Sequence, residues 1–228
     1  MKVLAIAHRA GNSLSTLRAA TELGADVLEA DVHAFRGRLE VRHSKSLGPL
    51  PWLWDRPGPP RVAGGRPRRV EWTPVSVPQL QLRELLAALD GRSTLMVDLK
   101  GPGGVGHQVV QSLHQRLPDQ PVLVCSRWWP GVDSFAGQRW ALPLLTARNR
   151  VELARLRGRV RGAQAPYGVS VHRSLLTPIL VAELHERVEM VLTWPVNDPA
   201  TLDHVLSCGV SGVISDEPDI LRAVLARR

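Results

Sequence analysis

Residues 24–32 read Gly-Ala-Asp-Val-Leu-Glu-Ala-Asp-Val, and this stretch favours one fold class over the others. Gly24 stands where a glycine ends a helix that begins near Asn12 or Ser13. Residues 27–32 form a short, largely apolar run, which is typical of a strand covered on both faces of a parallel sheet. A helix followed at once by such a strand predicts an α/β fold with parallel strands.

The same alternation of strands and amphipathic helices continues along the chain. Leucines at 82, 85, 86 and 89 show the i, i+3, i+4, i+7 spacing of one helical face, and the apolar residues at 220, 221, 224 and 225 also fall on one helical face. The expected strands are residues 3–7, 27–32, 95–99, 122–125, 141–145, 162–165, 188–193 and 212–215. Eight strands favour a closed (β/α)₈ TIM barrel, for which 228 residues is near the usual size. A doubly wound open sheet is the alternative.

A hairpin and a long insert interrupt this rhythm within what we expect to be a single domain, residues 1–228. Residues 39–43 alternate after a turn at 36–38, which predicts a small β-hairpin on the second strand. The insert, residues 44–78, is rich in Pro, Gly and Arg and has no clear periodicity, so we expect a long loop. Either its tryptophans only anchor it, or Trp52, Trp54 and the charges of residues 56–69 cover the site and select a headgroup or lipid tail.

The amino-acid composition limits which binding partners and which cellular compartment we expect. The net charge of +8, from 29 Lys and Arg against 21 Asp and Glu, favours anionic partners such as phosphate esters. The basic residues are dispersed, so nucleic acid is not expected. We expect neither a signal peptide nor a membrane span, because no apolar run approaches the roughly 20 residues that a bilayer requires. Cys125 and Cys208 lie in apolar surroundings and are expected to be reduced, which predicts a cytoplasmic protein.

Acidic residues and histidines follow the predicted strands, where a barrel concentrates its function. Glu29 and Asp31 are two residues apart, so both carboxylates point to one face of a strand and suit a hard cation. An isolated pair of this kind more often caps a helix or pairs with arginine. Here Asp98, His8 and His43 end neighbouring segments, and the five residues together favour a metal site with two proton carriers.

The order of these motifs resembles the glycerophosphodiester phosphodiesterase family, and the match spans almost the whole chain. The matching segments are His8-Arg9, residues 12–26, Glu29-Ala30-Asp31-Val32, His43, Asp98-Leu99-Lys100, Trp194-Pro195-Val196-Asn197 and residues 209–218. Some positions depart from the family pattern. Ala10 replaces glycine, Ser44 replaces the aspartate after His43, Asp98 replaces glutamate and Pro195 replaces threonine. Lys45 could supply charge beside His43 in place of that aspartate.

The resemblance implies a metal-dependent phosphodiesterase that releases glycerol 3-phosphate and an alcohol from a small-molecule glycerophosphodiester. The residues implied are Glu29, Asp31 and Asp98 for Mg²⁺ or Ca²⁺, His8 and His43 for proton transfer, and Arg9, Lys100 and Trp194 for the substrate. Arg9 and Lys100 would stabilise charge on the phosphoryl oxygens, and Trp194 would pack against the alcohol. Peripheral contact with a membrane or a lysolipid is compatible with this implied site.

Other interpretations stay open. The same scaffold could act as a lysophospholipase D-like enzyme on lysolipids, or as a catalytically silent homologue or non-catalytic basic binding barrel. Gly101, Gly103 and Gly106 form G-x-G-x-x-G, which would suit a dinucleotide, but the acid expected about 20 residues on is absent. Lys100 could instead form a Schiff base in an aldolase-like barrel.

Overall fold

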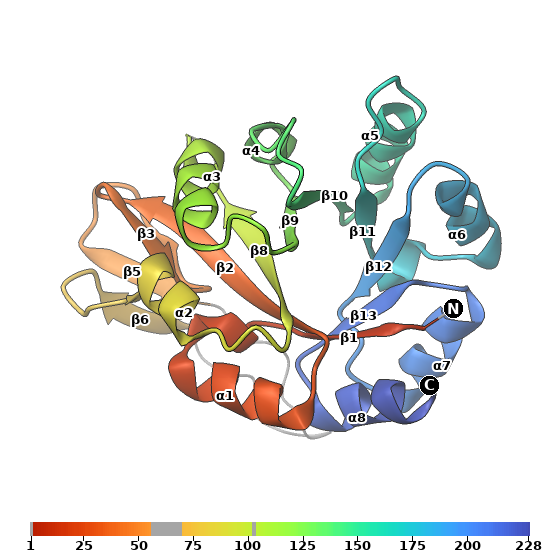
Figure 1. Ribbon diagram of the computed structural model, residues 1–228, viewed down its shortest axis with the longest axis horizontal. Coiled ribbons are helices and arrows are strands. Elements are labelled where there is room, and N and C mark those ends of the chain that lie inside the picture. The colour runs from red at the N-terminus through yellow and green to blue at the C-terminus, as the bar shows by residue number, and fades with distance from the viewer. Residues whose placement is uncertain (1, 56–69, 102–103) are drawn as a thin grey trace.

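The strand that carries Glu29 and Asp31 is β2 (Val27–Phe35), and it pairs in parallel with both β1 (Leu4–Ala7) and β8 (Thr94–Lys100). The computed structural model describes residues 2–55, 70–101 and 104–228 (Figure 1). The parallel sheet continues through β9 (Val122–Ser126), β10 (Ala141–Ala147), β11 (Gly168–His172), β12 (Met190–Trp194) and β13 (Gly212–Ser215). Because β13 pairs with β1, eight parallel strands of the described chain close into a barrel. The predicted TIM barrel is confirmed, and the open sheet is excluded.

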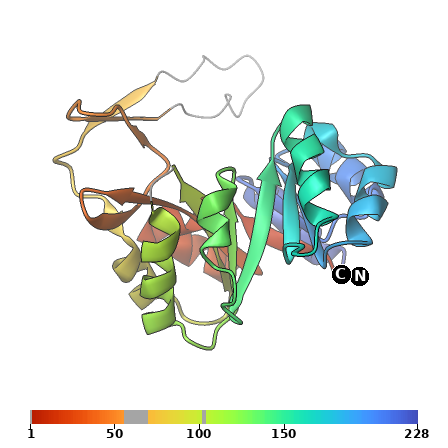
Figure 2. The same cartoon turned by 90° about the horizontal axis from the view of Figure 1, so that it is seen from above.

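Helices cover the outside of this barrel (Figure 1, Figure 2). They are α1 (Leu14–Leu23), α2 (Leu82–Ala88), α3 (Val105–Arg116), α4 (Trp129–Asp133), α5 (Arg150–Val160), α6 (Pro178–His185), α7 (Pro199–Ser207) and α8 (Pro218–Ala226). The ends of α1 are as expected. The Ser13 side chain accepts from the Thr16 N–H, and Gly24, at φ 82°, ends the helix. None of the described helices has both the length and the apolar character needed to cross a bilayer.

Alternation along the strands separates two apolar layers. One layer lies between the strands and the helices, and the other fills the barrel interior with side chains such as Ile6, Val27, Met96 and Leu192. Cys125 lies in this interior and Cys208 in the outer layer, and both are buried and free. The interior apolar layer ends towards the carboxyl ends of the strands, so polar side chains occupy the next positions there.

The sixth strand lies later in the chain than predicted. Residues 162–165 lie in an irregular segment after α5, and the strand is β11 at Gly168–His172. The predicted segment was wrong because Gly162, Ala163 and Ala165 have low strand propensity and Pro166 follows at once. Val169 and Val171 are β-branched and fully buried, and they carry the strand instead.

The hairpin is confirmed, but the insert has more structure than expected. β3 (Arg38–Val41) pairs antiparallel with β2, and β7 (Leu80–Gln81) adds to β3. Within the insert, β4 (Lys45–Ser46), β5 (Trp52–Asp55) and β6 (Glu71–Pro74) form an antiparallel sheet, here called the insert sheet. The expectation of an unstructured loop was therefore wrong for these strands, while the charges of residues 56–69 lie outside the described residues. Figure 1 and Figure 2 show the insert sheet beside β3 at one side of the barrel.

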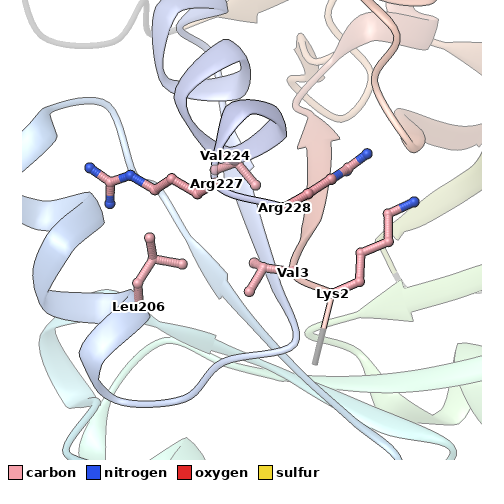
Figure 3. Close-up of a pocket in the computed structure, with 6 residues that line it drawn as sticks. All are labelled: Lys2, Val3, Leu206, Val224, Arg227 and Arg228. Carbon is pink, nitrogen blue, oxygen red and sulfur yellow. The ribbon is translucent and has the colours of Figure 1, made fainter.

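A hollow of about 540 Å³ lies at the amino ends of the strands, on the opposite side of the barrel from the predicted site (Figure 3). Its lining includes Val3, Leu206 and Val224 with Lys2, Arg227 and Arg228. Its cations are engaged, since Lys2 and Arg228 pair with Asp26, and Arg227 pairs with Asp203. The predicted chemistry is concentrated at the other end.

Replacing Gly106 by alanine should destabilise the protein. A Cβ at this position of α3 would lie 2.3 Å from the Gly131 carbonyl oxygen of α4, so the two helices would have to separate. We expect a loss of about 1–3 kcal/mol in the free energy of unfolding, measured by urea denaturation. Gly158→Ala in α5 is the matched control, because its Cβ meets open space and should add roughly 0.5–1 kcal/mol. Equal stability of Gly106→Ala and the wild type would contradict this packing.

Candidate active site

Strand alternation delivers the acidic residues to the barrel mouth. On β2, Glu29 and Asp31 share a face with Val27, which packs in the barrel interior. On β8, Asp98 follows the interior residue Met96 in the same way. The register pairs Asp31 with Asp98 directly across the two strands. The three predicted metal ligands therefore meet at one point, with carboxylate oxygens all within 4.8 Å of one another.

Burial shapes the protonation of this cluster. Glu29 is 3% exposed and Asp31 is 0% exposed. Burial, and then the charge of Asp31, raises the pKa of Glu29 to about 7. Burial likewise raises the pKa of Asp98. Burial would also raise the pKa of Asp31, but the Lys100 ammonium overcomes it and holds that pKa well below its usual range.

Lys100 balances only part of this charge. Its Nζ lies 2.7 Å from Asp31 Oδ1 and also contacts Asp98 Oδ2. Burial would lower the pKa of Lys100, but Asp98 and Asp31 raise it well above its ordinary value. Lys100 can neutralise one of three carboxylates, and a divalent cation would neutralise the other two. The oxygen-only donor set is the type that Mg²⁺ and Ca²⁺ prefer, so the residues present fit such an ion.

The turn after β1 holds the cluster from one side. The Arg9 backbone N–H donates to Glu29 Oε2 at 2.6 Å, with Arg9 in the left-handed region at φ 57°. Asn12 makes two hydrogen bonds to Asp31. Its Nδ2 donates to Asp31 Oδ2 at 2.7 Å, and its Oδ1 accepts from the Asp31 N–H at 2.9 Å. Gly11 permits this contact, because a Cβ there would lie 2.6 Å from the Cβ of Ala30.

His8 follows β1 and lies beside the carboxylates. Its Nδ1 lies 2.8 Å from Asp216 Oδ1, and its Nε2 lies 4.0 Å from Glu29 Oε2. Asn197 Nδ2 donates to the other oxygen of Asp216 at 3.1 Å. Burial would lower the pKa of His8, but the hydrogen bond to Asp216 and then the charge of Glu29 raise it above its ordinary value. Burial would raise the pKa of Asp216, but its hydrogen bond to His8 holds it at about 2.

His43 approaches from the hairpin side. Its Nε2 lies 2.8 Å from Arg9 Nη2, and its Nδ1 lies 2.6 Å from Asp55 Oδ1. A guanidinium can only donate hydrogen bonds, so Nε2 of His43 accepts and the ring proton is on Nδ1. Lys45 does not take the role suggested for it, because its Nζ lies over the Trp54 ring, 5.2 Å from the centroid.

Trp194 ends β12 on the far side of the mouth. It packs against the barrel interior, and its indole meets the His172 ring edge-on with centroids 5.1 Å apart. Seven of the predicted site residues are joined through direct contacts around the carboxylates. Trp194 instead belongs to the opposite wall.

Some residues of the site escaped prediction. Asp216 lay within the matching segment 209–218 without an expected role, and its side chain binds His8. Asn12 and Asn197 lay within matching motifs without an expected role. Asp55 lay in the insert, where no periodicity pointed to it.

Two rival interpretations lose support from this geometry. A Schiff-base lysine needs a lowered pKa, whereas the pKa of Lys100 is raised by its carboxylate partners. The dinucleotide fingerprint belongs to a doubly wound sheet rather than a closed barrel, and its Gly103 lies outside the described residues. Gly106 instead allows α3 to approach α4 closely.

Comparison with known proteins gives a consistent picture. No protein-family model matches the chain. A curated protein of Mycobacterium tuberculosis (strain ATCC 25618 / H37Rv), named "Probable glycerophosphodiester phosphodiesterase 2", is 26% identical over 99% of this chain and 91% of its own length. The glycerophosphodiester phosphodiesterase of Thermotoga maritima has the same fold, with a TM-score of 0.73 and 18% identity over 100% of this chain and 99% of its own. An Oleispira antarctica phosphodiesterase was solved in complex with the product sn-glycerol-3-phosphate. It matches with a TM-score of 0.72 and 18% identity, over 97% of this chain and 96% of its own.

The fold and the site define a phosphodiesterase-like (β/α)₈ barrel with an acidic cluster at its carboxyl end. The predicted resemblance to the glycerophosphodiester phosphodiesterase family is confirmed: the chain is similar to such proteins over nearly its whole length.

The affinity of the acidic cluster for Mg²⁺ or Ca²⁺ should rise between about pH 6 and about pH 8. Glu29, whose pKa is raised to about 7, must lose its proton before it can bind an ion. Metal binding near neutral pH should therefore release protons, which calorimetry in two buffers of different ionisation enthalpy measures. Glu29→Gln should bind metal more weakly and release fewer protons. A wild-type affinity that is independent of pH over this range would contradict the role of Glu29.

Proposed function

We propose that this protein is a cytoplasmic, metal-dependent phosphodiesterase that hydrolyses glycerophosphodiesters to sn-glycerol 3-phosphate and an alcohol. The observation that carries the proposal is the convergence of three carboxylates and two aspartate-bound histidines at one barrel mouth. The named activities of the relatives agree with it. A non-catalytic basic barrel would give no reason to bury Glu29 and Asp31 beside a third acid.

In this proposal Glu29, Asp31 and Asp98 hold Mg²⁺ or Ca²⁺, which supplies Lewis-acid polarisation of the phosphodiester. Arg9 offers a planar fork of donors to the phosphoryl oxygens, and Lys100 offers a point charge. The Lys100 ammonium already contacts Asp31 and Asp98, and the Arg9 guanidinium lies against His43 Nε2, so both cations are close to where charge develops on the phosphoryl group. Trp194 packs against the glycerol or the alcohol from the opposite wall.

The two histidines differ in their proton state, and this suits them to opposite roles. His43 has an accepting lone pair on Nε2, so it takes the proton of the attacking hydroxyl, which belongs either to the substrate or to water. Arg9 must pass its hydrogen bond from His43 to a phosphoryl oxygen when substrate enters. His8 donates Nδ1–H to Asp216, and its raised pKa allows Nε2–H to protonate the leaving alcohol. The alcohol then departs as a neutral molecule. Where the hydroxyl of the substrate attacked, water opens the resulting cyclic phosphate to glycerol 3-phosphate, with His8 taking the proton of water and His43 returning its proton to the glycerol oxygen.

The direct test is release of glycerol 3-phosphate from glycerophosphocholine and glycerophosphoethanolamine, with and without EDTA. We expect turnover that EDTA abolishes and that Mg²⁺ or Ca²⁺ restores. Glu29→Gln should remove metal-dependent turnover, and His43→Ala should lower kcat by about 10²–10⁴-fold through loss of the proton acceptor. His114→Ala is the matched control, because this histidine is exposed on α3 and should change nothing. Absence of turnover with any divalent metal would count against the proposal.

A second substrate class, lysolipids, is favoured by the insert sheet. Trp54 lies opposite Trp72 in the register and Lys45 lies opposite Trp54, while Trp52 shares a face with Trp54. This face, here called the tryptophan face, thus carries three indoles and one ammonium. Leu53 and Asp55 point the other way, and Leu53 is 1% exposed.

The exposure of the tryptophan face suggests that it binds a partner. Trp52 is 43% exposed and Trp72 is 55% exposed, although indoles are among the most costly side chains to leave in water. Indoles combined with positive charge suit the boundary between lipid headgroups and acyl chains, and the chain carries a net charge of +8. We therefore propose that this face contacts the acyl chain of a lysolipid, or the lipid surface that presents it.

Replacing the exposed tryptophans should separate the two substrate classes. In Trp52→Ser/Trp72→Ser we expect turnover of lysophosphatidylcholine to fall by about tenfold or more, because the lost indoles no longer bury apolar surface. Turnover of glycerophosphocholine should stay within about twofold of the wild type, since no acyl chain is involved. Ile179→Ser, which removes an exposed apolar side chain from α6, serves as the control. Equal losses on both substrates, or none on either, would rule out the lipid role.

A further inference from the structure

The insert sheet brings one carboxylate to the candidate active site. Asp55 is the last residue of β5, and its Oδ1 lies 2.6 Å from His43 Nδ1. It shares a strand face with buried Leu53, so the contact comes from the face opposite to the tryptophan face. The His43 and Asp55 side chains are each about one quarter exposed, which leaves the hydrogen bond partly shielded from water. The hydrogen bond between Asp55 and His43 therefore lies on the packed face of the insert sheet.

Two contacts on the same ring fix the state of His43. Arg9 Nη2 lies 2.8 Å from Nε2 and can only donate, which requires a lone pair on Nε2. The remaining ring proton must then be on Nδ1, where Asp55 accepts it. When Arg9 passes its hydrogen bond to a phosphoryl oxygen, Asp55 is the one of these two contacts that still holds the proton on Nδ1. A proton on Nε2 would block the atom that must accept one.

The other histidine of the site is held in the same manner. His8 donates from Nδ1 to Asp216 at 2.8 Å, and this leaves Nε2 directed at Glu29. In both pairs a carboxylate from another segment of the chain binds Nδ1 and leaves Nε2 at the reacting side. Aspartate in this position fixes both the tautomer and the orientation of an imidazole that acts through Nε2.

We infer that Asp55 is a positioning residue for His43: it holds the imidazole in the Nδ1–H tautomer and aims Nε2 at the reacting atoms. The catalytic meaning of this inference rests on the proposed function, whereas the tautomer does not. The insert sheet is then part of the acid–base machinery, because it delivers the carboxylate on which that machinery relies. Asp55 acts through His43 and does not itself touch the substrate.

The tautomer gives a test that needs no activity. In protein labelled with ¹⁵N-histidine, His43 should show a protonated Nδ1 and an unprotonated Nε2 at neutral pH, with its signals assigned by their loss in His43→Ala. In an Arg9→Met background, where the donor to Nε2 is absent, Asp55→Asn should shift these signals towards the Nε2–H tautomer. Glu71→Gln is the matched control, because Glu71 lies opposite Asp55 in the register of the same sheet. Unchanged His43 signals when Asp55→Asn is added to folded Arg9→Met would overturn the inference.

Kinetic measurements test separately whether Asp55 supports proton transfer by His43. Asp55→Asn should lower kcat for glycerophosphocholine by about 10²–10⁴-fold and leave KM within about twofold, because the substrate contacts are intact. Glu71→Gln should retain wild-type kcat, and Asp55→Glu should recover part of it. Circular dichroism and thermal melting establish that each variant is folded. A folded Asp55→Asn with wild-type kcat would also overturn the inference. An inactive wild type that shows the predicted tautomer shift would count against the proposed function alone.

Discussion

Three carboxylates meet at one end of the barrel, two of them buried and Asp98 about one quarter exposed, and this is the constraint on which the rest of the site depends. Desolvation disfavours their charged forms, as the raised pKa of Glu29 and of Asp98 indicates. The surrounding chain compensates with the Lys100 ammonium, the Arg9 N–H and the Asn12 amide. Each of these donors lies at the end of a strand or in the turn that follows it. The barrel thus places the carboxylates and the groups that compensate their negative charge at the same end.

The two histidines flank this cluster, and the chain fixes them by different means. Asp216 reaches His8 because β13 pairs with β1, so closure of the barrel sets the distance between them. Asp55 reaches His43 through the insert sheet, which is not a part of the barrel. Barrel closure therefore positions one histidine, and a sheet outside the barrel positions the other.

The sequence allowed the barrel and most of its site to be predicted, because these depend on local patterns. The Glu29-x-Asp31 spacing places both acids on one strand face wherever the strand lies, and continuous apolar runs indicated seven of the eight strands correctly. The insert sheet could not be found in the same way. β4 has two residues, too few to show a period, and β5 and β6 pair across 15 intervening residues. The partnership of Asp55 with His43 goes with the pairing of β5 and the two-residue strand β4, which is too short to be recognised from a local pattern.

Alternation along β5 separates two properties of the insert. Residues two apart on a strand share a face, so Leu53 and Asp55 turn towards the barrel while Trp52 and Trp54 turn away. A substitution on the tryptophan face leaves the backbone path of β5 and the Asp55 contact in place. The outer face can therefore vary with the substrate while the inner face keeps the geometry of His43. A two-sided strand beside an active site allows substrate choice and proton transfer to change independently.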